Sequence, residues 1–202
     1  MKSEAATRPY RQVSRAEGHE RTREALLDAA ETTFFAGGWD AASLTGLAAL
    51  AGVTKQTLLR HFGSKAGLRQ VAMERAMARV RDQRWAAPTD DVAGAVANLL
   101  DHYEAVGERA LMIGRLGGGE PTGEDATTLT ASQAMHHEWV DHAFGGRLGA
   151  LPDPVRVRRR AALIALCDVQ AWWILSHDLG QSRPETQATL TDAIERLLEE
   201  TT

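Results

Sequence analysis

Residues 43–68 read SLTGLAALAGVTKQTLLRHFGSKAGL, and their pattern predicts the structure of the N-terminal part of the chain. Apolar side chains recur at the i, i+3, i+4 and i+7 spacing of an amphipathic helix in Leu44, Leu47, Ala48 and Ala51. Ser43 is expected to cap that helix, and Gly52 ends it in a tight turn. Thr54 is expected to cap a second helix that runs to about Phe62. Two short helices joined by a turn are therefore predicted.

The second helix has one apolar face and one polar face. At about 100° per residue, Leu58 and Phe62 point toward the first helix, while Arg60 points away with Gln56 and Thr57 beside it. This is the arrangement of a helix-turn-helix, whose second helix enters the major groove of DNA. Arginine pairs with guanine and glutamine with adenine, each contributing about 1–3 kcal/mol of base discrimination. The residues nearer the edges of this face, which we expect to hold phosphates, are Lys55, His61 and Lys65.

The stretch resembles the DNA-binding signature of the TetR family of bacterial transcriptional regulators. The matching residues are Leu47-Ala48, Ala51 to Thr54, Thr57-Leu58, His61-Phe62, Lys65 and Leu68, and the match extends upstream through Thr22 to Trp39. The resemblance implies phosphate contacts from Thr54, Lys55, His61 and Lys65 and base contacts from Gln56, Thr57 and Arg60. The full set of expected DNA-binding residues also includes Ser43, Thr45 and Leu59.

Three residues depart from the family pattern. Leu59 stands where the family usually places a tyrosine whose hydroxyl reaches DNA, so that contact is expected to be missing. Gly46 lies inside the first of the two helices, where it costs about 1 kcal/mol relative to alanine. Gly67 replaces the glutamate that often completes a capping box after Ser64. These changes weaken local helices without removing the motif.

Charge divides the chain into a basic and an acidic part. Residues 1–84 hold 14 Lys+Arg against 9 Asp+Glu, a net charge of +5, whereas residues 85–202 have a net charge of −9. A polyanionic partner is therefore expected for the first part only. We predict a flexible basic arm over residues 1–20, a helix-turn-helix domain with its linking helix over 21–84, and an effector-binding and dimerisation domain over 85–202.

The arm carries Arg8, Arg11 and Arg15, and two interpretations of it stay open. It reaches into the adjacent minor groove, as homeodomain arms do, or it is a disordered solubilising tail.

Composition is that of a soluble protein, with 44% hydrophobic and 25% charged residues among 202. The longest apolar candidate, residues 161–175, is shorter than the ~20 residues of a membrane-spanning helix and is interrupted by Asp168 and Gln170. The N-terminal residues lack the apolar segment of a secretory signal, and one cysteine, Cys167, cannot form an internal disulfide. We expect a cytoplasmic protein without a membrane partner.

An all-α fold is predicted, because helical periodicity continues from Arg21 to Glu200 and no sustained β-type alternation occurs. The expected helices outside the motif span about 22–35, 65–84, 92–103, 111–116, 124–144, 155–178 and 184–200. The resemblance implies that the C-terminal helices bind a small effector and that the last two form a homodimer. The stripe expected to face the partner, together with residues 161–175, is Leu190, Ile194, Leu197 and Leu198. A two-fold dimer sets its recognition helices about 34–36 Å apart on a pseudo-palindromic operator.

Effector-pocket candidates are polar and aromatic residues of the middle helices, where family pockets lie. They are Tyr103, Met112, Trp139, Phe144, Cys167, Asp168, Trp172 and Trp173. Ordinary core packing is the alternative for each of them. Asp168 is the most informative, because a carboxylate in an apolar helix must find a partner.

No catalytic, metal or cofactor site is expected. The run from His136 to His142 contains several metal-ligating residue types, but it is not HExxH, and His137 and His142 are turned about 140° from each other on a helix. The predicted function is a DNA-binding transcriptional regulator, a repressor released from its operator by an effector. The alternatives are an activator or effector-dependent DNA binder of the same fold, a helical interaction module without sequence-specific DNA binding, and an enzyme that uses the histidine cluster.

Overall fold

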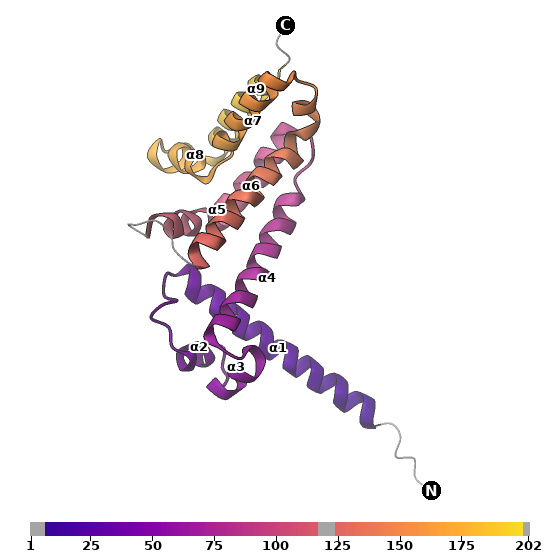
Figure 1. Cartoon of the computed structure of the whole chain (residues 1–202), viewed down its shortest axis with the longest axis vertical. Helices are drawn as coiled ribbons and strands as arrows, with labels where there is room; N and C mark the ends of the chain where they lie inside the picture. Colours follow the sequence, from indigo (N-terminus) through magenta and orange to yellow (C-terminus); the bar gives the residue numbers. More distant parts are fainter. Residues whose placement is uncertain (1–6, 117–123, 200–202) are drawn as a thin grey trace. The chain divides into compact units, whose positions relative to one another are not determined.

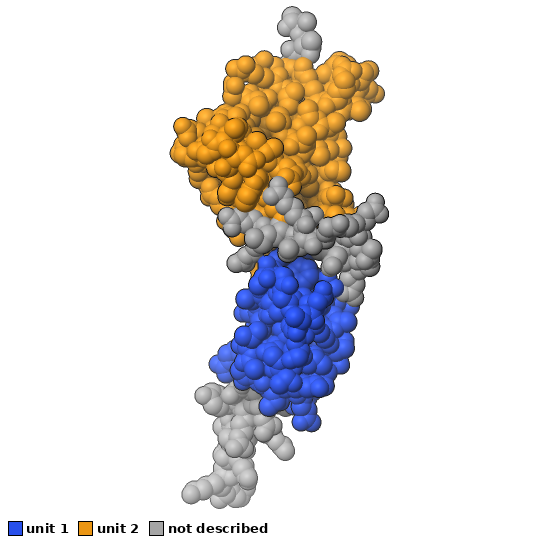
Figure 2. All heavy atoms as spheres, turned by 90° about the vertical axis from the view of Figure 1, so that its left-hand side faces the viewer, with its two compact units in different colours: residues 1–78 blue, residues 79–202 orange. Residues whose placement is uncertain are grey.

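A computed structural model describes residues 7–116 and 124–199, with side chains described over 17–107, at 111 and over 129–199. Every regular element in these ranges is a helix, which confirms the predicted all-α fold (Figure 1). The chain divides into two compact units, Met1–Ala78 and Arg79–Thr202, coloured separately in Figure 2. The division falls before the boundary expected after Arg84.

The N-terminal unit contains α1 (Thr7–Phe35), α2 (Leu44–Leu50), α3 (Lys55–Phe62) and the first part of α4 (Lys65–Trp85). The first helix begins at Thr7 rather than near Thr22, so much of the segment expected to be a flexible arm is helical. Pro9 is compatible with this start, since it lies in the first turn, where a backbone N–H has no helical acceptor.

The core of the N-terminal unit joins all four helices. Its buried side chains are Leu26, Leu27, Ala29, Ala30, Phe34, Trp39, Leu47, Ala48, Leu58, Leu68, Ala72 and Ala76. Beside this core, the Arg75 guanidinium of α4 is bound to Glu31 at 2.8 Å, to Asp28 at 2.6 Å and to Glu24, all on α1. These bonds raise the pKa of Arg75 against the opposing effect of burial. The guanidinium therefore ties α4 to α1.

The C-terminal unit contains α5 (Val92–Leu116), α6 (Glu124–Gly149), α7 (Asp153–Leu166), α8 (Val169–Trp173), the π-helix η1 (Ile174–Asp178) and α9 (Arg183–Leu198). The segments 92–103 and 111–116, predicted as separate helices, belong to one helix, α5. The continuous helix predicted over 155–178 is wrong, because α7 ends at Leu166, with Cys167 as its C-cap, and the Asp168 side chain caps α8 by accepting the Gln170 N–H at 2.8 Å. The cap is the partner that this carboxylate needed.

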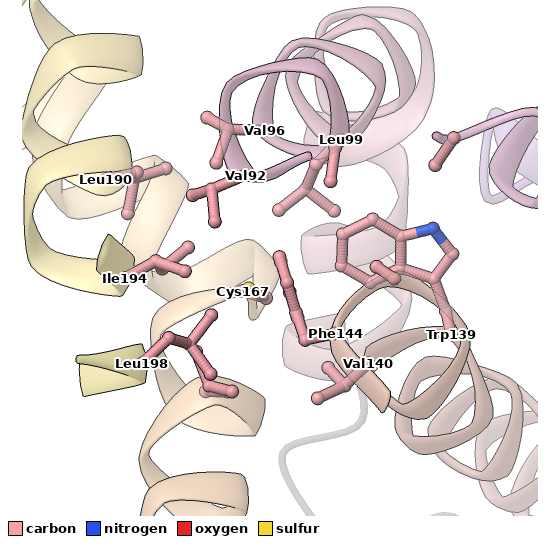
Figure 3. Packing of buried hydrophobic residues seen from close by; sticks show 14 of the residues in the cluster. Val92, Val96, Leu99, Trp139, Val140, Phe144, Cys167, Leu190, Ile194 and Leu198 are labelled. Atoms are coloured by element: carbon pink, nitrogen blue, oxygen red, sulfur yellow. The ribbon is translucent and has the colours of Figure 1, made fainter. Parts of the chain in front are cut away.

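The core of the C-terminal unit is shown in Figure 3. Trp139 and Phe144 of α6 lie edge to face with ring centroids 5.9 Å apart, next to Cys167. Leu190, Ile194 and Leu198 of α9 point into the same core and are at most 4% exposed. Three of the four residues predicted to face a partner subunit therefore stabilise their own subunit, because α9 packs against α5 and α7.

The last turn of α4 packs with the C-terminal unit, which explains where the chain divides. The side chains and carbonyls of Gln83 and Asn98 exchange hydrogen bonds of 2.8 and 3.0 Å between α4 and α5. The indole of Trp139 donates to the carbonyl oxygen of Arg84 at 2.9 Å. None of the helices in the described ranges is long and apolar enough to cross a membrane.

Candidate functional site

The turn between α2 and α3 is fixed by two caps and a glycine. Ser43 accepts the Gly46 N–H at 3.0 Å and caps α2. Gly52 has φ +68°, a backbone conformation that glycine adopts without steric cost. Thr54 caps α3 by accepting the Thr57 N–H at 3.2 Å, and the hydroxyl oxygens of Thr54 and Thr57 lie 3.0 Å apart. The helix-turn-helix geometry therefore follows from local backbone chemistry.

The two faces of α3 are arranged as the periodicity predicts. Leu58 is fully buried and anchors the helix in the core. Gln56 and Arg60 are exposed, as is Lys55 at the start of the helix. An exposed glutamine and an exposed arginine, four positions apart on a helix anchored by a leucine, present base-reading donors and acceptors on one surface.

His61 has a different environment from the one expected for a phosphate contact. Its ring lies 4.0 Å from the ring of His19 on α1, measured between centroids. Burial and the neighbouring His19 and Arg60 lower the pKa of His61. Its Nε2 is buried and has no hydrogen-bond partner. In this structure His61 joins α3 to α1.

Lys65 also contacts the protein itself. Its Nζ donates to the carbonyl oxygen of Trp39 at 2.6 Å and to that of Asp40 at 3.3 Å, and it lies 5.1 Å from the Trp39 ring centroid. The ammonium group therefore connects the start of α4 to the loop that precedes α2. Sequence reasoning missed this contact, because nothing in the motif brings residue 39 next to residue 65.

The remaining expected DNA contacts differ in exposure. Ser43, Thr45 and Thr54 are exposed, whereas Thr57 and Leu59 are half-buried. Leu50, at the end of α2, is 70% exposed, which the sequence analysis did not single out.

Residues 26–72 match the family model of the bacterial regulatory proteins of the tetR family. These residues form a TetR-family DNA-binding domain. The chain is therefore a DNA-binding transcriptional regulator, as the sequence resemblance implied. The match covers the end of α1, all of α2 and α3, and the beginning of α4.

The whole chain is similar in fold to a TetR-family regulator from Streptomyces coelicolor A3, whose crystal structure it matches with a TM-score of 0.51 and 20% sequence identity. The match covers 90% of this chain and 96% of that one. The C-terminal helices thus share the TetR-type fold, although the residues differ. Comparison with curated proteins gives no match.

The predicted effector residues of this regulator are mostly core residues. Tyr103, Trp139, Phe144, Cys167 and Trp172 belong to the buried cluster of the C-terminal unit, and Trp173 packs against it. Asp168 is half-buried at its capping position, and the side chain of Met112 lies outside the described residues. Burial raises the pKa of the Cys167 thiol to about 12, so the sulfur stays neutral and apolar.

A cavity of about 290 Å³ opens beside Trp172. Its walls come from α5, α8, η1 and α9, and they consist of Leu100, Glu104, Trp172, Ser176, His177, Arg183 and Thr186. The hydroxyl oxygen of Thr186 is buried and has no hydrogen-bond partner. Of the predicted effector residues, Trp172 is the one that lines this cavity.

Arg84 is a functional candidate that sequence reasoning missed. This arginine of α4 is 4% exposed, and its guanidinium carbon lies 4.4 Å from the Trp139 ring centroid and 5.9 Å from that of Tyr103. The hydroxyl of Tyr103 donates to the carbonyl oxygen of Cys167 at 2.7 Å. No sequence pattern distinguishes Arg84 from the exposed Arg81, which lies one turn earlier on the same helix.

The residues from His136 to His142 lie on α6, and the helix directs their side chains to different partners. Glu138 is exposed and pairs with Arg81 at 3.2 Å, and Asp141 pairs with Arg160 at 2.6 and 2.7 Å. His142 stacks on Trp85, with ring centroids 5.7 Å apart. Over the described ranges, no three His, Cys, Asp or Glu side chains are grouped so that they could hold a metal ion.

Proposed function

We propose that this regulator acts in the cytoplasm as a homodimeric repressor, which binds a pseudo-palindromic operator and is released from it by a small-molecule effector. The observation that carries the proposal is the surface of α3, where Gln56 and Arg60 are exposed around the buried anchor Leu58. A glutamine and an arginine presented together read adenine and guanine in the major groove. The tetR family match over residues 26–72 supports this use of the surface.

Exposed apolar residues of the C-terminal unit support the dimer. Val157 on α7 is 66% exposed, Ile174 at the start of η1 is 47% exposed, and Leu179 just after η1 is 66% exposed. We propose that the dimer interface covers these three side chains. A two-fold interface presents two copies of α3 to successive half-sites.

Effector release requires that the ligand bind one conformation of the dimer more tightly than the other. The helix α4 is the element through which such a preference reaches DNA. It begins at Lys65, three residues after α3 ends, and it reaches Trp85 in the C-terminal unit.

Selection of bound duplexes from a random DNA pool tests the proposal. We expect an enriched inverted repeat at about 150 mM salt, where phosphate contacts alone are weakened. The Gln56→Ala, Arg60→Ala double variant is the control and should lose the enrichment while remaining folded by circular dichroism. Binding without sequence preference, by a folded dimer, would instead support a nonspecific DNA-binding or interaction module.

A further inference from the structure

Arg84 is a buried cation, and its Nε donor has no hydrogen-bond partner. A guanidinium group has five N–H donors and always carries its charge. Here Nη2 lies 3.4 Å from Nδ1 of His136, and Nε is buried without a hydrogen-bond partner. The rings of Trp139 and Tyr103 stabilise the cation through their faces, and the side chain of Tyr103 is also hydrogen-bonded to Arg84.

The histidines beside Arg84 are neutral. Nε2 of His136 lies 2.9 Å from the carbonyl oxygen of Ile164, which can only accept, so Nε2 carries the proton and Nδ1 accepts from Arg84. Burial lowers the pKa of His136 despite that bond. Burial and the nearby Arg84 and His136 lower the pKa of His102 to about 3. The surroundings of Arg84 therefore contain two neutral imidazoles.

A carboxylate partner for Arg84 is missing from the described part of the chain. None of the ion pairs over these residues includes Arg84. Burial is the main cause that raises the pKa of Tyr103 and of Cys167, and the charge of Asp168 raises both further, so Asp168 influences this region electrostatically. Its carboxylate, however, accepts the Gln170 N–H at 2.8 Å as the cap of α8. A buried guanidinium without a counter-ion is costly for a folded protein, and an anion that binds it repays that cost.

We propose that the effector of this regulator carries a carboxylate, which binds the guanidinium of Arg84 between Trp139, Tyr103 and His136. The proposal rests on the proposed effector-controlled function and names the chemical class of the effector. Arginine presents a planar pair of N–H donors that matches the two oxygens of a carboxylate. The aromatic rings hold the guanidinium plane in place before the ligand arrives, so little side-chain freedom is lost on binding.

The position of Arg84 connects the ligand to DNA binding. Arg84 lies in the last turn of α4, and the same helix begins next to α3. A carboxylate bound to this guanidinium contacts α4, the helix that joins the two units. A conformation of α4 that binds the anion more tightly is then favoured, and the operator affinity changes with it.

Thermal unfolding of the full chain without DNA tests the proposal. The probes are hexanoate and benzoate at about 10 mM, with hexanamide and benzamide as matched neutral controls, because a ligand of millimolar Kd measurably raises the Tm. We expect at least one carboxylate to raise the Tm of the wild-type protein by about 2 °C or more, and neither amide to do so. No shift with either carboxylate, or equal shifts with the amides, would overturn the proposal.

Two variants locate the effect. Arg84→Met should abolish the carboxylate shift and leave the ligand-free Tm equal to or above that of the wild type, since it removes a buried charge. Arg81→Met is the matched control, because Arg81 lies on the same helix, 4.2 Å from the Trp85 ring centroid, but is exposed and paired with Glu138. It should retain the shift. A shift that persists in Arg84→Met, or a large loss of ligand-free Tm in that variant, would show that Arg84 is structural.

These readouts are independent of DNA binding. If the carboxylates do not raise the Tm while duplex selection yields an inverted repeat, the proposed regulator function is supported and the proposal of a carboxylate effector is wrong. If no sequence is enriched while the carboxylates raise the Tm through Arg84, the ligand site is supported and the proposed control of an operator is wrong.

Discussion

Gln56 and Arg60 stand in solvent on α3 around the buried Leu58, whereas Arg84 is 4% exposed among aromatic rings of the C-terminal unit. The first pair, which we propose reads bases, is held outward by the apolar anchor Leu58. Arg84 is placed inside the apolar core, and no ion pair over the described residues includes it. An exposed polar side chain has little effect on the stability of the fold, whereas a buried cation lowers that stability. Substitutions on the exposed face of α3 should therefore change DNA binding without changing stability. Substitutions around Arg84 should change both stability and ligand binding.

The largest effect is expected for Leu58, which anchors α3 in the core and so holds the proposed base-reading face. Leu58→Ala removes a fully buried side chain and should lower the free energy of unfolding by about 2–5 kcal/mol. Arg60→Ala, two residues along the same helix, should change it by no more than about 0.5 kcal/mol. Urea unfolding of both variants checks this contrast. Equal losses of stability would mean that the exposed face of α3 also supports the fold.

The second effect is expected for His102, a half-buried histidine near Arg84. The pKa of His102 is about 3 in the folded state against 6.5 in the unfolded state, so between these values only the unfolded state binds the proton. The contribution of His102 to the free energy of unfolding is therefore complete above pH 6.5 and is lost as the pH falls below that value. The expected loss between pH 7.5 and pH 5 is about 2 kcal/mol from this group.

His102→Gln should flatten that part of the pH–stability profile. The control is His137→Gln, at an exposed histidine of α6, which should keep the wild-type profile. Urea unfolding at a series of pH values measures both. An unchanged slope in His102→Gln would show that this histidine is not held neutral by burial.

A third, smaller effect distinguishes two lysines of the DNA-binding domain. Lys65→Met removes the bonds to the Trp39 and Asp40 carbonyls and should lower the free energy of unfolding by about 1–2 kcal/mol. Lys55 is exposed, so Lys55→Met should leave stability unchanged while lowering the salt dependence of DNA binding by about one unit. If Lys65→Met instead alters only the salt dependence, its ammonium group contacts phosphate when DNA is bound.

The smallest effect is expected at the cap of α3. Thr54→Ala removes the acceptor for the Thr57 N–H and should cost about 1 kcal/mol of stability. Thr45→Ala, at an exposed threonine of α2, is the control and should cost less than about 0.5 kcal/mol. Thermal unfolding of the two variants compares them. A loss at Thr45 as large as that at Thr54 would argue against a specific role of the cap.

The helix-turn-helix was predictable because its determinants are local. Ser43, Gly52 and Thr54 act within three or four residues of themselves, and the position of Leu58 follows from helical periodicity. The division of polar and apolar faces on α3 needed no knowledge of the remaining chain. The expected contacts of these residues with DNA stay predictions.

Tertiary contacts were not predictable in the same way. Cys167 and Asp168 interrupt an apolar segment that periodicity alone continues, because a capping carboxylate outweighs the propensity of its neighbours. The stripe of α9 looks the same in sequence whether it faces a partner or its own core. The environment of Arg84 could not be predicted, because it depends on the packing of α4, α5 and α6, which places its guanidinium next to Tyr103 and Trp139.

The most direct test of the central claim is the affinity of Arg60→Ala for the selected duplex and for duplexes with single base-pair changes. If α3 reads bases through its exposed face, the variant loses discrimination at one symmetric base position by about 1–3 kcal/mol and keeps it elsewhere. An equal loss of affinity on every duplex would contradict the account, since it would make Arg60 a phosphate contact.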